Sequence, residues 1–178
     1  MAEFLPVVDA DDNVIGKKER LLVHRDGDLH RVAHVWVYNE KGEVLCQKRA
    51  AGVEISPNTW DCIVGGHVEY GKSYEQTALS EASEEYGLSI EENRLAHLFK
   101  VRADIYTKEA KCFKFVDSFA LRYDGELSEI QFNEKEVSEL QWLSFQQLEA
   151  IKAGKDSSKK FFGFLTFDQA RSRITELL

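Results

Sequence analysis

Proline is almost absent from this sequence, with only Pro6 and Pro57 among its 178 residues. No proline- or serine-rich linker divides the chain, and no repeat or low-complexity tract occurs in it. A chain of 178 residues has the length of one ordinary domain. We therefore predict a single domain over residues 1–178, with residues 1–30 forming an N-terminal hairpin and lead-in.

Cysteine is also scarce. Cys46, Cys62 and Cys112 are odd in number and show no C-x-x-C spacing, which argues against a disulfide framework or a zinc site and favours reduced thiols in a cytoplasmic protein. No apolar run reaches the 18 or so residues of a membrane span. The N-terminus has neither a basic start nor an apolar core, so we expect no secretion signal.

Positive charge is in the minority. Lys and Arg number 23 against 31 Asp and Glu, giving a net charge of −8. Because a general nucleic-acid binder normally presents a basic face, we expect neither general nucleic-acid binding nor a membrane partner. An acidic chain can still bind a small phosphorylated molecule through a metal ion or a local basic cluster.

Short apolar alternations predict five to seven strands. These are expected as hairpins over residues 5–17 and 32–49, and as extended segments over residues 60–64, 95–106, 111–123 and 139–143. Three helices are expected between and after them: from a Ser73 N-cap to a Gly87 C-cap, from a Ser144 N-cap to about Ala153, and over residues 167–178. Because strands and helices do not strictly alternate, the fold class is α+β or mixed α/β.

The first of these helices carries three glutamates on one face. Glu81, Glu84 and Glu85 stand at positions i, i+3 and i+4, where neighbouring Cβ atoms are roughly 5–6 Å apart. A hard divalent cation would neutralise the repulsion between them, and carboxylate oxygens are the ligands that Mg²⁺ or Mn²⁺ prefers. A solvated helix face is the alternative for the triple alone. The preceding glycines favour a phosphate and metal site, because they let the backbone fold closely against the start of the helix.

Residues 66–88 resemble the Nudix box. Gly66-x5-Lys72-x7-Ser80-Glu81-Ala82-x-Glu84-Glu85-x-Gly87-Leu88 has the spacing of G-x5-E-x7-R-E-U-x-E-E-x-G-U, in which U is a bulky apolar residue. The resemblance implies a Nudix-type α/β/α sandwich, a mixed sheet flanked by helices. It also implies a hydrolase of nucleoside diphosphate derivatives that uses Mg²⁺ or Mn²⁺. The implied metal ligands are Glu81, Glu84, Glu85 and Gly66.

Three positions depart from that pattern. Lys72 stands where the family has Glu, Ser80 where it has Arg, and Ala82 is small for a bulky position. The reversed charge of Lys72 is expected to pair with Glu69, Glu75 or a site glutamate. A non-catalytic nucleotide-binding module is therefore an open alternative.

The N-terminal half is similar to the isopentenyl-diphosphate-isomerase-like branch of Nudix proteins, in Val7–Gly16, Leu29–Val37, Gln47–Arg49 and Trp60-Asp61. The isomerase requires a Cys at the position of Gly65 and acidic residues at the positions of Cys112 and Lys114. Since an alkene isomerisation needs an acid and a base at fixed places, we predict a hydrolase and keep an altered isomerase as an alternative. Three histidines, His24, His30 and His67, match metal-binding histidines of the isomerase; surface or hydrogen-bonded histidines are the competing interpretation.

Further residues are assigned roles in catalysis and substrate binding. The candidates for the general base are Glu85 and Glu84 within the box and Glu136, with Glu134, in the loop before the last strand. The residues expected to bind the diphosphate substrate are Arg49, Lys48, His67, Trp60 and Arg31. The family resemblance is compatible with a homodimer.

Overall fold

The structure is a computed structural model that describes residues 2–88, 90–106 and 111–178. Its strands are β1 (Phe4–Val8), β2 (Val14–Glu19), β3 (His30–Tyr38), β4 (Glu43–Arg49), β5 (Trp60–Asp61), β6 (Val64–His67), β7 (Leu95–Tyr106), β8 (Lys111–Arg122) and β9 (Val137–Ser144). Its α-helices are α1 (Arg20–Asp26), α2 (Tyr74–Tyr86), α3 (Phe145–Lys152) and α4 (Phe167–Leu177). Among the helices of the described chain, none has the length and apolar character needed to cross a membrane.

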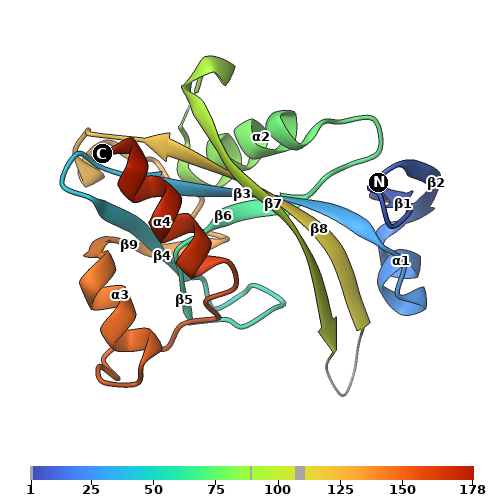
Figure 1. Ribbon diagram of the computed structural model, residues 1–178. Helices are drawn as coiled ribbons and strands as arrows, with labels where there is room; N and C mark the ends of the chain where they lie inside the picture. The colour runs from blue at the N-terminus through green and yellow to red at the C-terminus, as the bar shows by residue number, and fades with distance from the viewer. Residues whose placement is uncertain (1, 89, 107–110) are drawn as a thin grey trace.

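The main sheet is mixed. Its order is β5-β4-β3-β8-β7, with β6 also paired to β3 and β9 to β4, while β1 and β2 form a separate hairpin (Figure 1). The pairing of β3 with β8 is parallel, and the other pairings in this sheet are antiparallel. The predicted mixed sheet is therefore confirmed.

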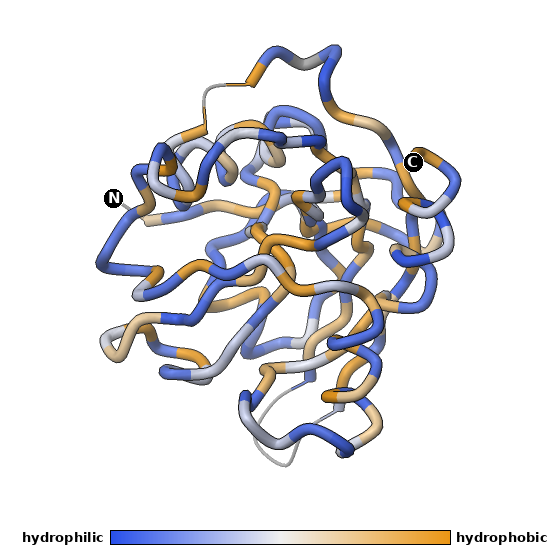
Figure 2. Tube along the Cα trace, turned by 90° about the vertical axis from the view of Figure 1, so that its left-hand side faces the viewer, coloured by the Kyte–Doolittle hydropathy of each residue, from blue (hydrophilic) through white to orange (hydrophobic). Residues whose placement is uncertain are grey.

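Helices cover both faces of this sheet (Figure 1). Alternate residues of β3 point to opposite faces, so Val35 and Val37 pack with Ala78 of α2, whereas Trp36 packs with Phe167 of α4. The hydrophobic segments accordingly gather in the interior and the hydrophilic ones in the outer loops (Figure 2). Each fully buried large apolar side chain stabilises the fold by about 1.5–3 kcal/mol. The predicted α/β/α sandwich is confirmed.

Three details differ from the sequence prediction. Strands β3 and β4 pair only at Tyr38 and Val44, beside their turn, because β3 is paired along its length with β6 and β8 while β4 is paired with β9 and β5. The strand predicted over residues 60–64 is broken at residues 62–63. Helix α1 was not predicted, because its start has no side-chain cap to mark it in the sequence.

The ends of α2 follow the predicted signals. The Ser73 side chain accepts from the backbone N–H of Gln76 at 3.1 Å, and the Gln76 side chain accepts from the backbone N–H of Ser73 at 2.9 Å. The helix ends at Gly87, whose φ of 65° lies in the left-handed region. This capping fixes the register of the helix, and thereby the direction of its glutamates.

Replacing Gly87 with alanine should destabilise the protein more than the same change at Gly71. Both glycines have a positive φ, so both variants carry the backbone cost of about 1–2 kcal/mol. A Cβ at Gly87 would lie 2.6 Å from the backbone oxygen of Gln131, whereas a Cβ at Gly71 would have no heavy atom within 4 Å. In urea unfolding, the free energy of unfolding of Gly87→Ala should be about 1–2 kcal/mol lower than that of Gly71→Ala. Equal unfolding free energies would show that the Gln131 contact is unimportant.

Candidate active site

A cavity of about 690 Å³ opens where α2 meets the sheet. The three box glutamates, Glu81, Glu84 and Glu85, lie in its wall, together with the glycine pair of β6. Carboxylates and the basic side chains of Arg20, Arg49 and Lys114 therefore line a single space.

Glu85 is held in place by two other elements. Its Oε2 accepts a hydrogen bond from Gln47 Nε2 on β4 at 2.9 Å, and its Oε1 accepts one from the backbone N–H of Gly65 on β6 at 3.3 Å. Gln47 also donates to the backbone oxygen of Ile63 at 3.0 Å, which fixes the amide itself. Burial, and to a smaller extent the charge of Glu81, raise the pKa of Glu85 to about 8.

Glu81 packs against the backbone of β6. A Cβ at Gly66 would lie 2.1 Å from Glu81 Oε1, so a larger residue at this position would displace the carboxylate from its present place. Burial raises the pKa of Glu81 to about 7, with the charges of Glu84 and Glu136 acting in the same direction. The raised pKa values mean that burial, with smaller effects of the neighbouring glutamates, makes it costly to keep these two carboxylates charged.

This donor set suits a hard divalent cation. Glu81, Glu84 and Glu85 offer carboxylate oxygens, which Mg²⁺ and Mn²⁺ prefer, and Gln47 orients one of the carboxylates as outer partners of metal ligands commonly do. A bound cation would offset the cost of keeping Glu81 and Glu85 charged, which is the cost that raises their pKa values. The chemistry of these donor atoms therefore fits the implied metal.

A second group of potential ligands lies nearby. Within the described ranges, His24, His30 and His67 are the one group of three or more His, Cys, Asp or Glu residues whose ligand atoms all lie within 4.8 Å of one another. The Nε2 atoms of His24 and His67 are 3.1 Å apart. His30 donates from Nδ1 to the backbone oxygen of Asp28 at 3.1 Å, which leaves its Nε2 as an acceptor, and this buried atom has no partner in the described chain.

Strand β8 supplies neither of the acidic residues that the isomerase would place beside these histidines. Lys114 is in register with His30, and Cys112 lies two residues before it on the same strand. A lysine ammonium opposes a metal cation at the histidines, whereas the imidazole lone pairs attract one. The site thus differs in charge from a histidine and carboxylate metal centre.

Arg49, His67 and Glu136 of the predicted site line the cavity. Arg49 donates from Nε to the backbone oxygen of Ile55 at 3.0 Å, and its guanidinium lies over the ring of Phe162. Glu136 accepts a hydrogen bond from the side chain of Asn133 at 3.0 Å. Glu134, the other loop candidate, is exposed and does not line the cavity.

Other predicted substrate-binding residues lie outside its lining. Trp60 is only 5% exposed and belongs to the core between the sheet and α4. Lys48 Nζ is 3.9 Å from Glu139.

Lys72, which replaces an acidic box residue, pairs with Glu69 at 3.3 Å, one of the partners expected for it.

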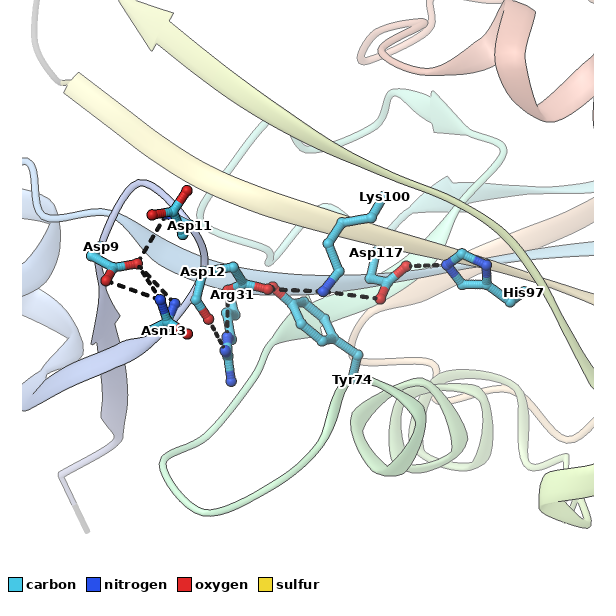
Figure 3. Close-up of polar contacts among 9 residues, drawn as sticks. All are labelled: Asp9, Asp11, Asp12, Asn13, Arg31, Tyr74, His97, Lys100 and Asp117. Atoms are coloured by element: carbon cyan, nitrogen blue, oxygen red, sulfur yellow. Dashed lines mark hydrogen bonds and ion pairs between the residues drawn. The ribbon is translucent and has the colours of Figure 1, made fainter.

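Arg31 is engaged with the N-terminal hairpin (Figure 3). Its Nε is 2.7 Å from Oδ1 of Asp12, in the turn between β1 and β2. Asp12 also accepts from Tyr74 of α2 at 3.1 Å and pairs with Lys100 of β7 at 2.8 Å. Lys100 lies 3.7 Å from Asp117, which extends the network to β8. Arg31 therefore ties the hairpin to the sheet and α2.

Sequence reasoning missed several residues that line the cavity, among them Gln47, Asp61, His34 and Lys114. Gln47 lies two residues before Arg49 and therefore on the same face of β4, which was a usable signal. Asp61 is directly opposite Gln47 in the pairing of β5 with β4. Burial raises the pKa of Asp61 to about 6.

Comparison with known proteins gives concordant matches. The family described as NUDIX domain matches residues 28–163. An uncharacterized Nudix hydrolase of Listeria innocua is 33% identical over 136 residues, which are 76% of either chain. Isopentenyl-diphosphate Delta-isomerase 2 of Photorhabdus laumondii is 32% identical over 155 residues, 85% of this chain and 82% of that protein. The crystal structure of DR0079 from Deinococcus radiodurans has a TM-score of 0.69 at 26% identity, covering 95% of this chain and 98% of that one.

Proposed function

Because the chain belongs to the NUDIX domain family, we propose that it is a metal-dependent hydrolase that cleaves a diphosphate linkage in a nucleoside diphosphate derivative or a similar small phosphorylated metabolite. The observation that carries this proposal is the glutamate face of α2, fixed against β4 and β6 at the wall of a cavity large enough for a small ligand. The hydrolases among the relatives support the reaction class.

In this proposal Glu81, Glu84 and Glu85 hold Mg²⁺ or Mn²⁺. The bound ion supplies charge neutralisation for the diphosphate and a water of lowered pKa. Arg49 orients the diphosphate through its guanidinium, which can bind two phosphate oxygens at once. Glu85 or Glu136 accepts the proton of the attacking water, since both carboxylates face the cavity.

The test is phosphate release from a panel of ADP-ribose, nucleoside diphosphates, dinucleotides and prenyl diphosphates, with Mg²⁺, with Mn²⁺ and with EDTA. We expect hydrolysis of at least one phosphoanhydride that disappears in EDTA. ADP-ribose is included because a NUDIX domain of Shewanella oneidensis NrtR has been crystallised with it. Absence of hydrolysis throughout, together with no metal binding by calorimetry, would favour a non-catalytic binding module.

An isomerase activity is the second candidate, because one relative carries that name. Position 65 argues against it, since a Cβ there would lie 2.2 Å from the backbone oxygen of Ala33 and leave no room for a cysteine. Lys114 and Cys112 likewise provide no carboxylic acid. Incubation with isopentenyl diphosphate and Mg²⁺ decides between the two: an allylic product would establish the isomerase.

We also propose that the activity belongs to a reducing compartment such as the cytoplasm. Cys46, Cys62 and Cys112 are all free thiols. Burial raises the pKa of Cys46 and Cys62, which keeps these two thiols protonated and unreactive.

A further inference from the structure

Lys114 occupies an unusual place in the cavity. It lies on β8 in register with His30 of β3, so the two side chains project from the same face of the sheet. Lys114 and His67 both line the cavity, and His67 is the member of the histidine group that connects it to the glycine pair of β6. Lys114 is therefore a cation of the cavity lining beside the histidine group.

Lys114 differs from the other two cations that line the cavity. Arg20 forms an ion pair with Glu3 at 2.8 Å, and Arg49 donates to a backbone oxygen and lies over Phe162. In the described chain, Lys114 has no carboxylate within 4.0 Å and no hydrogen-bond partner. A partly buried cation without a partner is unfavourable in the free protein, so this position suits a group that arrives with the ligand.

The charge of Lys114 reaches the inner surface of the cavity. It lowers the pKa of His24, His30, His34 and His67, in each case adding to the larger effect of burial. Charges of the same sign repel more strongly where burial keeps water out. A metal cation among the histidines would therefore be opposed by Lys114, whereas an anion would be attracted.

We propose that Lys114 and the adjacent histidines form an anion subsite for a phosphoryl group of the substrate, separate from the phosphates held at the glutamate face. The proposal rests on the proposed function in taking this cavity as the substrate site. Lys114 supplies the charge and N–H donors, and the imidazoles of His34 and His67 line the cavity with it. The proposal predicts that the substrate carries a further phosphate, in addition to the two phosphates of the linkage that is cleaved.

The experiment is a titration of metal-free protein in EDTA with inorganic phosphate, followed by NMR of the histidine ring signals. Wild type should show saturable binding, and Lys114→Gln should weaken it about tenfold, which corresponds to about 1.4 kcal/mol. Lys111→Gln is the matched control, because Lys111 is an exposed lysine on the same strand that does not line the cavity. It should bind phosphate as wild type does.

Two results would overturn the subsite: wild type without saturable phosphate binding, or Lys114→Gln with wild-type affinity. Tight binding of Zn²⁺ to the histidines of wild type, unaltered in Lys114→Gln, would also overturn it. The triple variant Glu81→Gln/Glu84→Gln/Glu85→Gln separates this proposal from the proposed function. This triple variant should still bind phosphate in EDTA, although it has lost its metal ligands. Phosphate binding therefore tests the subsite independently of whether the protein hydrolyses a diphosphate.

Discussion

Hydrolysis should fall about 10³-fold when Glu85 is replaced by glutamine. The change keeps the size of the side chain but removes a metal-binding charge from the glutamate face, and electrostatic stabilisation by a bound metal is worth several kcal/mol in the transition state. Glutamine can still accept from Gln47, so the fold should be kept. The measurement is kcat/KM on whichever panel substrate wild type cleaves.

Glu75→Gln provides the control for this variant. Glu75 lies in the first turn of the same helix and does not line the cavity. It should retain activity within about twofold of wild type. If Glu85→Gln kept more than a tenth of the wild-type rate, Glu85 would be neither a required metal ligand nor the base.

In EDTA, Glu81 and Glu85 together should lower the free energy of unfolding by about 2–3 kcal/mol, or about 100-fold in the folding equilibrium, between pH 6.5 and 8.5. Glu81 and Glu85 have pKa values of about 7 and about 8 in the folded protein, raised chiefly by burial, against an ordinary value near 4.5. In this window the folded state holds protons that the unfolded state has released. Stability must therefore fall as pH rises.

Four histidines act in the opposite direction near the lower end of this window. Burial lowers the pKa values of His24, His30, His34 and His67 in the folded protein, whereas an unfolded histidine, with an ordinary pKa near 6.5, is half protonated at pH 6.5. This contribution is the same in wild type and Glu85→Gln, so comparing the two isolates the glutamates. Urea unfolding across the window is the measurement. Glu85→Gln should remove most of the slope, and saturating Mg²⁺ should reduce it because the ion favours the charged carboxylates. If the dependence of stability on pH had the same slope in wild type and Glu85→Gln, the slope would come from groups other than Glu85.

The glutamate helix could be read from the sequence because its signals are local. Ser73 with Gln76, and Gly87 at the end, depend on residues three or fewer positions from each helix terminus. The spacing of Glu81 and Glu85 then follows from helix geometry alone. Strands β7 and β8 and helix α3 were also recovered from local alternation and capping, whereas α1 was not.

Partners distant in sequence could not be read in this way. Nothing near Arg31 in the sequence indicates that Asp12 would neutralise its charge. This ion pair depends on how the first hairpin folds back on the sheet. Trp60 was predicted as a substrate contact, but tertiary packing places it in the core. The role of Gln47 beside Glu85 likewise appears only when β4 and α2 are assembled.

The parallel pairing of β3 with β8 has a consequence for how the chain folds. It joins residues 30–38 to residues 114–122, so the centre of the sheet closes only after most of the chain is available. Long-range parallel pairing is slow, because the entropy of loop closure is lost before the contacts form. We expect folding on the millisecond to second scale, and during synthesis α2 should wait for β8 before its glutamates meet the completed cavity.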